Sequence, residues 1–125
     1  MDENEGNEGI DWARDDFSDI IKDDDRYDPR AYALTSVVIG ESTGDGRHIS
    51  GQELLERFRD FVLDEFGPMS FTVLADWGVN CCADVGEIVF NLVESGRIGK
   101  TESDSRADFI GGYDFREAFL DPYVA

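Results

Sequence analysis

The feature that most restricts the fold is a run of apolar residues at helical spacing that begins after Ser50. Ser50 precedes Glu53 at the spacing of a capping box, in which each residue satisfies a backbone N–H of the other at a helix start. The apolar stripe that follows is Leu54, Leu55, Phe58, Phe61, Val62 and Phe66. Because Gly67-Pro68 ends a helix, the pattern predicts one amphipathic helix up to Phe66.

Two further helices and a hairpin are predicted in the same half of the chain. A short helix covers residues 69–77 and is closed by Gly78, and a longer one runs to about Ser95 before Gly96. The stripe of the longer helix is Val85, Ile88, Val89, Leu92 and Val93. Residues 97–101 and 107–110 have the pattern of extended segments joined by polar residues, which predicts a β-hairpin. Asp114 with Glu117 predicts one last capped helical turn.

The N-terminal third is predicted to form two helices behind a disordered acidic tail. Residues 1–9 carry too few apolar side chains to be buried, and a helical pattern starts at Ile10. Asp28 before Pro29 marks the second helix, since Asp is a good N-cap and proline suits the first turn. We therefore expect a single α+β domain over residues 10–125, mostly helical. Its N-terminal helices (10–46) precede a winged-helix-like part (47–120) with one β-hairpin.

The order of elements after Ser50 resembles that of winged-helix regulators. The resemblance rests on residues 74–79, Val85, Val89 and residues 92–98, with residues 104–106 in the wing, and it implies binding in the DNA major groove. The outward face of the helix that would enter the groove carries Asp84, Glu87, Asn91 and Glu94. Because phosphates repel carboxylates, we expect this face to contact a protein instead.

The overall charge also favours a protein partner over nucleic acid. The chain has 29 acidic and 11 basic residues and a formal net charge of −18, which repels nucleic acid and anionic lipid. We expect a protein or peptide partner, and the charge favours a basic one. The leading hypothesis is a non-enzymatic protein-interaction module. A winged-helix nucleic-acid-binding regulator and an enzyme with an unrecognised site stay open as alternatives. A single positive stripe of Arg57, Arg97, Lys100 and Arg106 would favour the regulator.

Most of the chain also resembles a small planctomycete-type family of bacterial hypothetical proteins. The similar segments are DRY at 25–27, AY at 31–32, SGQELL at 50–55, FGPM at 66–69, GEIVFNLV at 86–93, DSR at 104–106, DF at 108–109 and YDF at 113–115. The family has no activity attached to it, so the resemblance implies no catalytic residue, cofactor or ligand. Similar sequences place Ser or Thr where this chain has Cys81-Cys82, so Asn80 or Asp84 is expected to support that helix start.

Few residues qualify as catalytic or ligand-binding candidates. Cys81 and Cys82 are adjacent and cannot staple distant segments, and with no signal peptide or membrane-length apolar run visible we expect a cytoplasmic protein. Either thiol could be reactive at a helix start, but two small side chains filling a turn are the simpler interpretation. His48 is the single histidine, and residues 23–28 lack the spacing of a calcium loop. We expect no cofactor, metal or catalytic site. Phe90, off the centre of its stripe, is expected to pack on the first two helices or to contact a partner.

Overall fold

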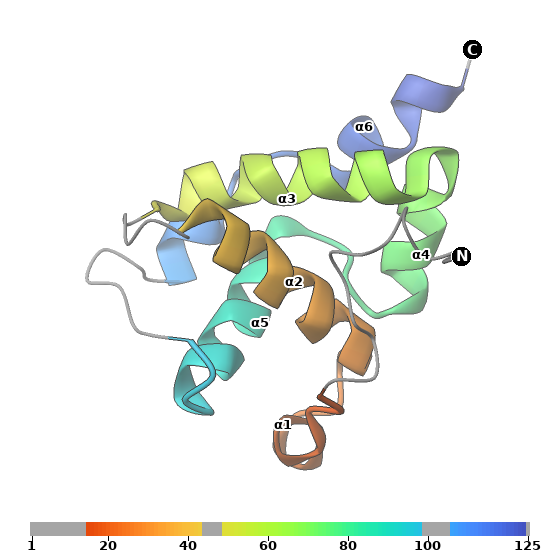
Figure 1. Cartoon of the computed structure of the whole chain (residues 1–125). Coiled ribbons are helices and arrows are strands. Elements are labelled where there is room, and N and C mark those ends of the chain that lie inside the picture. The colour runs from red at the N-terminus through yellow and green to blue at the C-terminus, as the bar shows by residue number, and fades with distance from the viewer. Residues whose placement is uncertain (1–14, 44–48, 99–105, 125) are drawn as a thin grey trace, which may run out of the picture.

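The computed structural model describes residues 15–43, 49–98 and 106–124, and every regular element in these ranges is helical (Figure 1). In chain order the elements are α1 (Ser18–Asp23), α2 (Pro29–Ser42), α3 (Gly51–Phe66), the 3₁₀ helix η2 (Gly67–Met69), α4 (Ser70–Asp76), α5 (Cys82–Glu94), η3 (Arg106–Phe109), α6 (Phe115–Phe119) and η4 (Asp121–Tyr123). Helix α2 packs against both α3 and α5, and α1 lies at the periphery (Figure 1). No described helix is both long and apolar enough to cross a membrane.

The predicted N-caps are confirmed, because each capping side chain accepts a hydrogen bond from a backbone N–H in the first turn of its helix. The bonds run from Arg30 to Asp28 (2.9 Å), from Glu53 to Ser50 (3.1 Å) and from Glu117 to Asp114 (3.3 Å). At the start of α5 the side chain of Cys81 makes no capping bond. Asp84 instead accepts from the backbone N–H of Asn80 at 2.9 Å, and so supports this helix start.

The core lies where α2, α3 and α5 meet. The predicted stripes of α3 and α5 face it, and their most buried members are Leu55, Phe58 and Val62 on α3 and Val85, Ile88 and Leu92 on α5. Helix α2 adds Tyr32, Leu34 and Val38. Burying one such side chain contributes roughly 1.5–3 kcal/mol, so the contact among these helices is a main source of stability.

The predicted β-hairpin and the α+β class are wrong. The described residues contain no strand, residues 106–109 form η3, and residues 99–105 lie outside the described ranges. The reason is a tertiary contact. Phe109 is buried against α5 at Gly86, where an added Cβ would lie 2.8 Å from Phe109 Cβ. Gln52 of α3 also donates to the carbonyl of Asp108 at 2.7 Å. These contacts hold the segment as a helical turn against two helices, and the described fold is all-α.

Helix α1 starts only at Ser18 within the described residues. Residues 1–14, which include the predicted acidic tail and the first turn of the predicted helix, lie outside the described ranges. The side chains of Asp15 and Asp16 accept bonds from the N–H groups of Phe17 (2.8 Å) and Ser18 (3.0 Å), and such local bonds compete with helix formation. Phe17 itself is left-handed, with φ 55°, which ends the helical conformation on this side.

Gly86→Ala tests the contact that replaces the predicted hairpin. An added methyl group would overpack the site against buried Phe109 at a cost of about 1–3 kcal/mol, and the gain in helix propensity offsets up to about 1 kcal/mol, so we expect the free energy of unfolding to fall by roughly 1–2 kcal/mol. Gly40→Ala in α2 is the matched control. Nothing lies within 4 Å of a Cβ at that position, and helix propensity alone should raise stability by up to about 1 kcal/mol. Urea denaturation measures both changes, and equal stability of the two variants would contradict the packing of Phe109 on α5.

Candidate interaction site on helix α5

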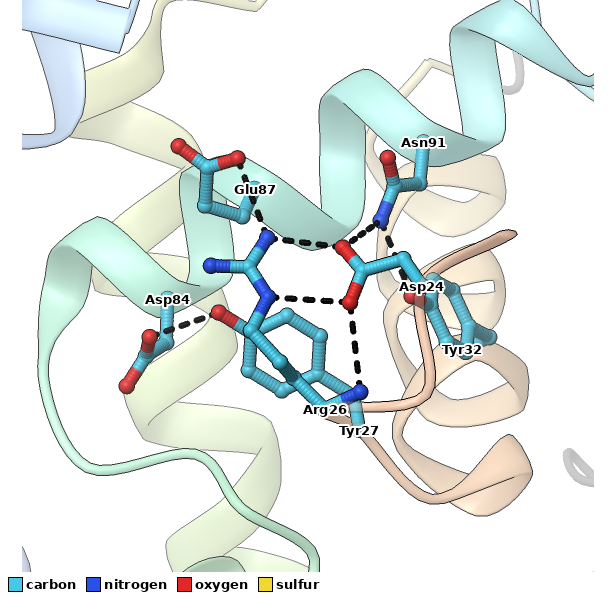
Figure 2. Close-up of polar contacts among 7 residues, drawn as sticks. All are labelled: Asp24, Arg26, Tyr27, Tyr32, Asp84, Glu87 and Asn91. Atoms are coloured by element: carbon cyan, nitrogen blue, oxygen red, sulfur yellow. Dashed lines mark hydrogen bonds and ion pairs between the residues drawn. The ribbon is translucent and has the colours of Figure 1, made fainter. Parts of the chain in front are cut away.

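The side of α5 that the sequence predicts to face solvent is largely covered by the N-terminal part of the chain. Asp84, Glu87 and Asn91 point toward residues 24–32 and form polar contacts with them (Figure 2). Glu94 is exposed. Glu87, Asn91 and Glu94, three of the predicted interaction residues, therefore share one side of the helix with Asp84, but most of that side binds the chain's own N-terminal segment.

Tyr27 fixes one end of this contact. Only 2% of its surface is exposed, and its hydroxyl donates to Asp84 Oδ1 at 2.6 Å (Figure 2). Burial, followed by the bond to the carboxylate, raises the pKa of Tyr27 well above its ordinary value. The hydroxyl therefore remains a hydrogen-bond donor at neutral pH and holds the segment against the first turn of α5.

Asn91 and Arg26 fix the middle of the contact. The amide of Asn91 donates to Asp24 Oδ2 and to the hydroxyl of Tyr32, both at 3.0 Å. Arg26 donates to Asp24 from Nη2 at 2.7 Å and from Nε at 2.9 Å. The guanidinium, and then the Asn91 bond, hold the pKa of Asp24 well below its ordinary value. Because Nη2 also lies 3.4 Å from Glu87 Oε1, Arg26 separates two carboxylates that would otherwise repel each other.

Arg97, just past the end of α5, holds the N-terminal segment at the C-terminal end of this helix. Its guanidinium donates to Asp15 at 2.7 and 3.0 Å and to Asp19 at 2.8 and 3.0 Å. It also lies 4.9 Å from the centre of the Phe17 ring, which stacks on Tyr32 at a centroid distance of 5.6 Å. The predicted strand placed Arg97 beside the wing, and no local pattern connects it with partners 78 and 82 positions earlier.

The remaining sequence candidates are dispersed over the chain. Phe90 is half-buried and lies edge-to-face against Phe109 of η3, with 6.4 Å between ring centroids. Both cysteines are free thiols, Cys81 exposed and Cys82 buried. Burial raises the pKa of the Cys82 thiol, which is the opposite of what a reactive thiolate requires. His48 lies outside the described ranges, and within them no group of His, Cys, Asp and Glu side chains could hold a metal ion.

Arginines in the described ranges are largely paired with the chain's own carboxylates. The ion pairs join Arg26 to Asp24 and Glu87, Arg30 to Asp28, Arg57 to Glu53, Arg59 to Asp60, and Arg97 to Asp15 and Asp19. Exposed pairs of this kind each contribute at most about 1 kcal/mol to stability, but each places a carboxylate beside a guanidinium and so offsets its positive charge locally. Arg57 and Arg97, two members of the positive stripe that would favour nucleic-acid binding, are both neutralised in this way.

Comparison with protein-family models, with curated proteins and with solved structures found no match to this chain. The resemblance to the planctomycete-type family therefore stays a prediction. No residue is assigned to a site by similarity, so the importance of the α5 face rests on the contacts described above.

Asn91→Asp tests the middle of the α5 contact. The change removes the amide donor and places a carboxylate beside Asp24, so we expect the free energy of unfolding to fall by roughly 2–3 kcal/mol. Asn80→Asp is the comparison at an exposed position before the same helix; it loses the 3.3 Å bond from the Asn80 amide to the carbonyl of Gly78 but places its charge where the helix dipole favours it, so we expect a loss below about 1 kcal/mol. Thermal and urea denaturation compare the two variants. A loss of the same size in both would show that the Asn91 contacts add nothing specific.

Asp24 also gives the contact a defined pH dependence. Its pKa in the folded state lies below the unfolded value of about 3.9, so its contribution to stability is present above that pH and is lost as the pH falls through the folded pKa. We expect Asp24→Asn to be about 1–2 kcal/mol less stable than the wild type near pH 6, and the two proteins to converge toward pH 2. Asp25→Asn, at the exposed neighbouring position, is the control in urea denaturation, and an equal loss of stability in both variants near pH 6 would contradict a specific role for Asp24.

Proposed function

We propose that this protein is a non-catalytic module that binds a positively charged protein partner through its acidic surface. The supporting observation is a contrast between the two signs of charge. Arg26, Arg30, Arg57, Arg59 and Arg97 are paired with the chain's own carboxylates, whereas Glu56, Asp60 and Asp64 are exposed along the outer side of α3. These three residues, spaced four apart, form an acidic row. Asp60 contacts Arg59 at 3.1 Å, while Glu56 and Asp64 form no ion pair within the described residues.

Core packing fixes the direction in which the acidic row faces. The opposite side of α3 carries Leu54, Leu55, Phe58 and Val62, all buried, so the helix cannot turn the row inward. Like charges four residues apart on a helix cost roughly 0.2–0.5 kcal/mol per pair. A cationic partner would remove that cost, and the field of the whole molecule would accelerate its approach.

The alternatives have weaker support. For α5 to enter a DNA groove, Asp84 and Asn91 would have to give up their contacts with the N-terminal segment and then face phosphates. For catalysis, Cys82 offers a buried thiol with a raised pKa, which is a poor nucleophile. We place the module in the cytoplasm, because the adjacent free thiols of Cys81 and Cys82 suit a reducing compartment.

The proposal is tested by neutralising the acidic row in the full-length chain. The row variant combines Glu56→Gln, Asp60→Asn and Asp64→Asn. We expect cross-linking in cells of the natural source, followed by mass spectrometry, to recover a basic protein with the wild type and not with the row variant. In extracts the same interaction should weaken sharply between about 50 and about 300 mM salt, since exposed charges are screened over that range.

A second variant with the same net charge separates the row from the general charge of the molecule. It combines Glu41→Gln, Glu94→Gln and Glu117→Gln, which are exposed and lie on α2, α5 and α6. This scattered variant should recover the partner as the wild type does. Recovery of no basic protein by the wild type, or equal recovery by the row variant, would refute the proposed function.

A further inference from the structure

Tyr32, Asn91 and Arg97 form a clamp around one segment of the chain. The ring of Phe17 stacks on Tyr32 with an interplanar angle of 28°, and the guanidinium of Arg97 lies 4.9 Å from the centre of the same ring. The same guanidinium bonds the carboxylates two residues before and two residues after Phe17, those of Asp15 and Asp19. Arginine suits this role because its planar group can bond carboxylates and stack on a ring at the same time.

The clamp is positioned by elements other than the segment it holds. Arg97 follows Gly96, whose φ of 83° ends α5, and the N–H of Arg97 bonds the carbonyl of Leu92 at 3.1 Å. Tyr32 is fully buried in α2, and its hydroxyl accepts a bond from Asn91 of α5 at 3.0 Å. These two hydrogen bonds involve no residue of the bound segment, so Arg97 and Tyr32 are positioned independently of it.

The bound segment, residues 15–24, buries two apolar side chains, Phe17 and Ile20, and has little regular structure of its own. Helix α1 has six residues, fewer than a helix needs to be stable in isolation. It lies at the periphery of the molecule (Figure 1). The chain is anchored again after this segment, where Tyr27 is buried and the N–H of Asp28 bonds the carbonyl of Trp77 at 3.0 Å. Asp25 lies between these two parts and is exposed, so a hinge at this position would disturb no buried side chain.

We propose that residues 15–24 are a detachable latch and that the clamp beneath them is a peptide-binding site. Its ligand is an acidic protein segment with an aromatic ring flanked by carboxylates two positions to either side. Asp15, Phe17 and Asp19 of the chain itself have this pattern and occupy the clamp in the structure. Tethering gives the latch a high effective concentration, so the clamp is closed to other segments until the latch opens. This site is separate from the acidic row, and its existence does not depend on the function proposed above.

The test is binding of a capped synthetic peptide of residues 15–24 to the full-length chain, measured by calorimetry. In the open variant, Asp15→Asn, Phe17→Ala and Asp19→Asn weaken the latch and leave the clamp intact. We expect the open variant to bind the peptide at least about tenfold more tightly than the wild type, whose clamp is occupied in cis. Adding Arg97→Gln to the open variant should abolish binding, and a peptide carrying Phe17→Ala should not bind.

Equal binding by the open variant with and without Arg97→Gln, or no binding by a folded open variant, would overturn the proposal. Hydrogen exchange of the unmodified chain keeps the latch testable if the open variant does not fold. The amides of Ile20, Ile21 and Asp24, which are bonded within the latch, should exchange at least about ten times faster than those of the central turns of α3. Exchange at the same rate as α3 would show that the segment leaves only on global unfolding, which excludes a latch.

Discussion

The placing of a few arginines between many carboxylates is the constraint on which this structure depends. With 29 acidic residues against 11 basic ones, almost any two segments that approach each other bring like charges together. Arg26 lies between Asp24 and Glu87, and Arg97 holds two further aspartates at the other end of the same contact. Without these cations the carboxylates would face one another, so the N-terminal segment docks on α5 where an arginine can be supplied.

This arrangement gives α5 two different sides. One side buries Val85, Ile88 and Leu92 in the core, and the other bonds the N-terminal segment through polar groups. The apolar contact excludes water and resists opening, whereas exposed ion pairs are individually weak. The two contacts should therefore differ in local stability, with the peripheral α1 opening first and α5 last. The outer side of α3, opposite its own buried stripe, stays exposed at Glu56, Asp60 and Asp64.

Local signals in the sequence correctly predicted where helices begin. The hairpin was predicted wrongly because contacts between residues far apart in the sequence determine the conformation there. The N-caps at Asp28, Ser50 and Asp114 bond backbone N–H groups two or three residues away, so their patterns are visible in the sequence. The hairpin prediction was wrong because the conformation of residues 106–109 depends on the packing of Phe109 against α5. A glycine in the middle of a helix, which costs about 1 kcal/mol relative to alanine, was the available signal, since Gly86 is where Phe109 packs.

The polar face of α5 shows why the candidate site could be found only in part. Helical periodicity separates apolar from polar positions, and it grouped Glu87, Asn91 and Glu94 on one side of the helix. It cannot separate a polar side in water from one that faces another segment, because the two have the same composition. The difference lies in the segment that docks there. Tyr27 and Tyr32 carry hydroxyls that need partners once their rings are buried, and the nearest acceptor and donor are on α5. Tyr27 and Tyr32 are thus the sequence signal for a covered helix face, because a tyrosine that is buried needs a polar partner for its hydroxyl.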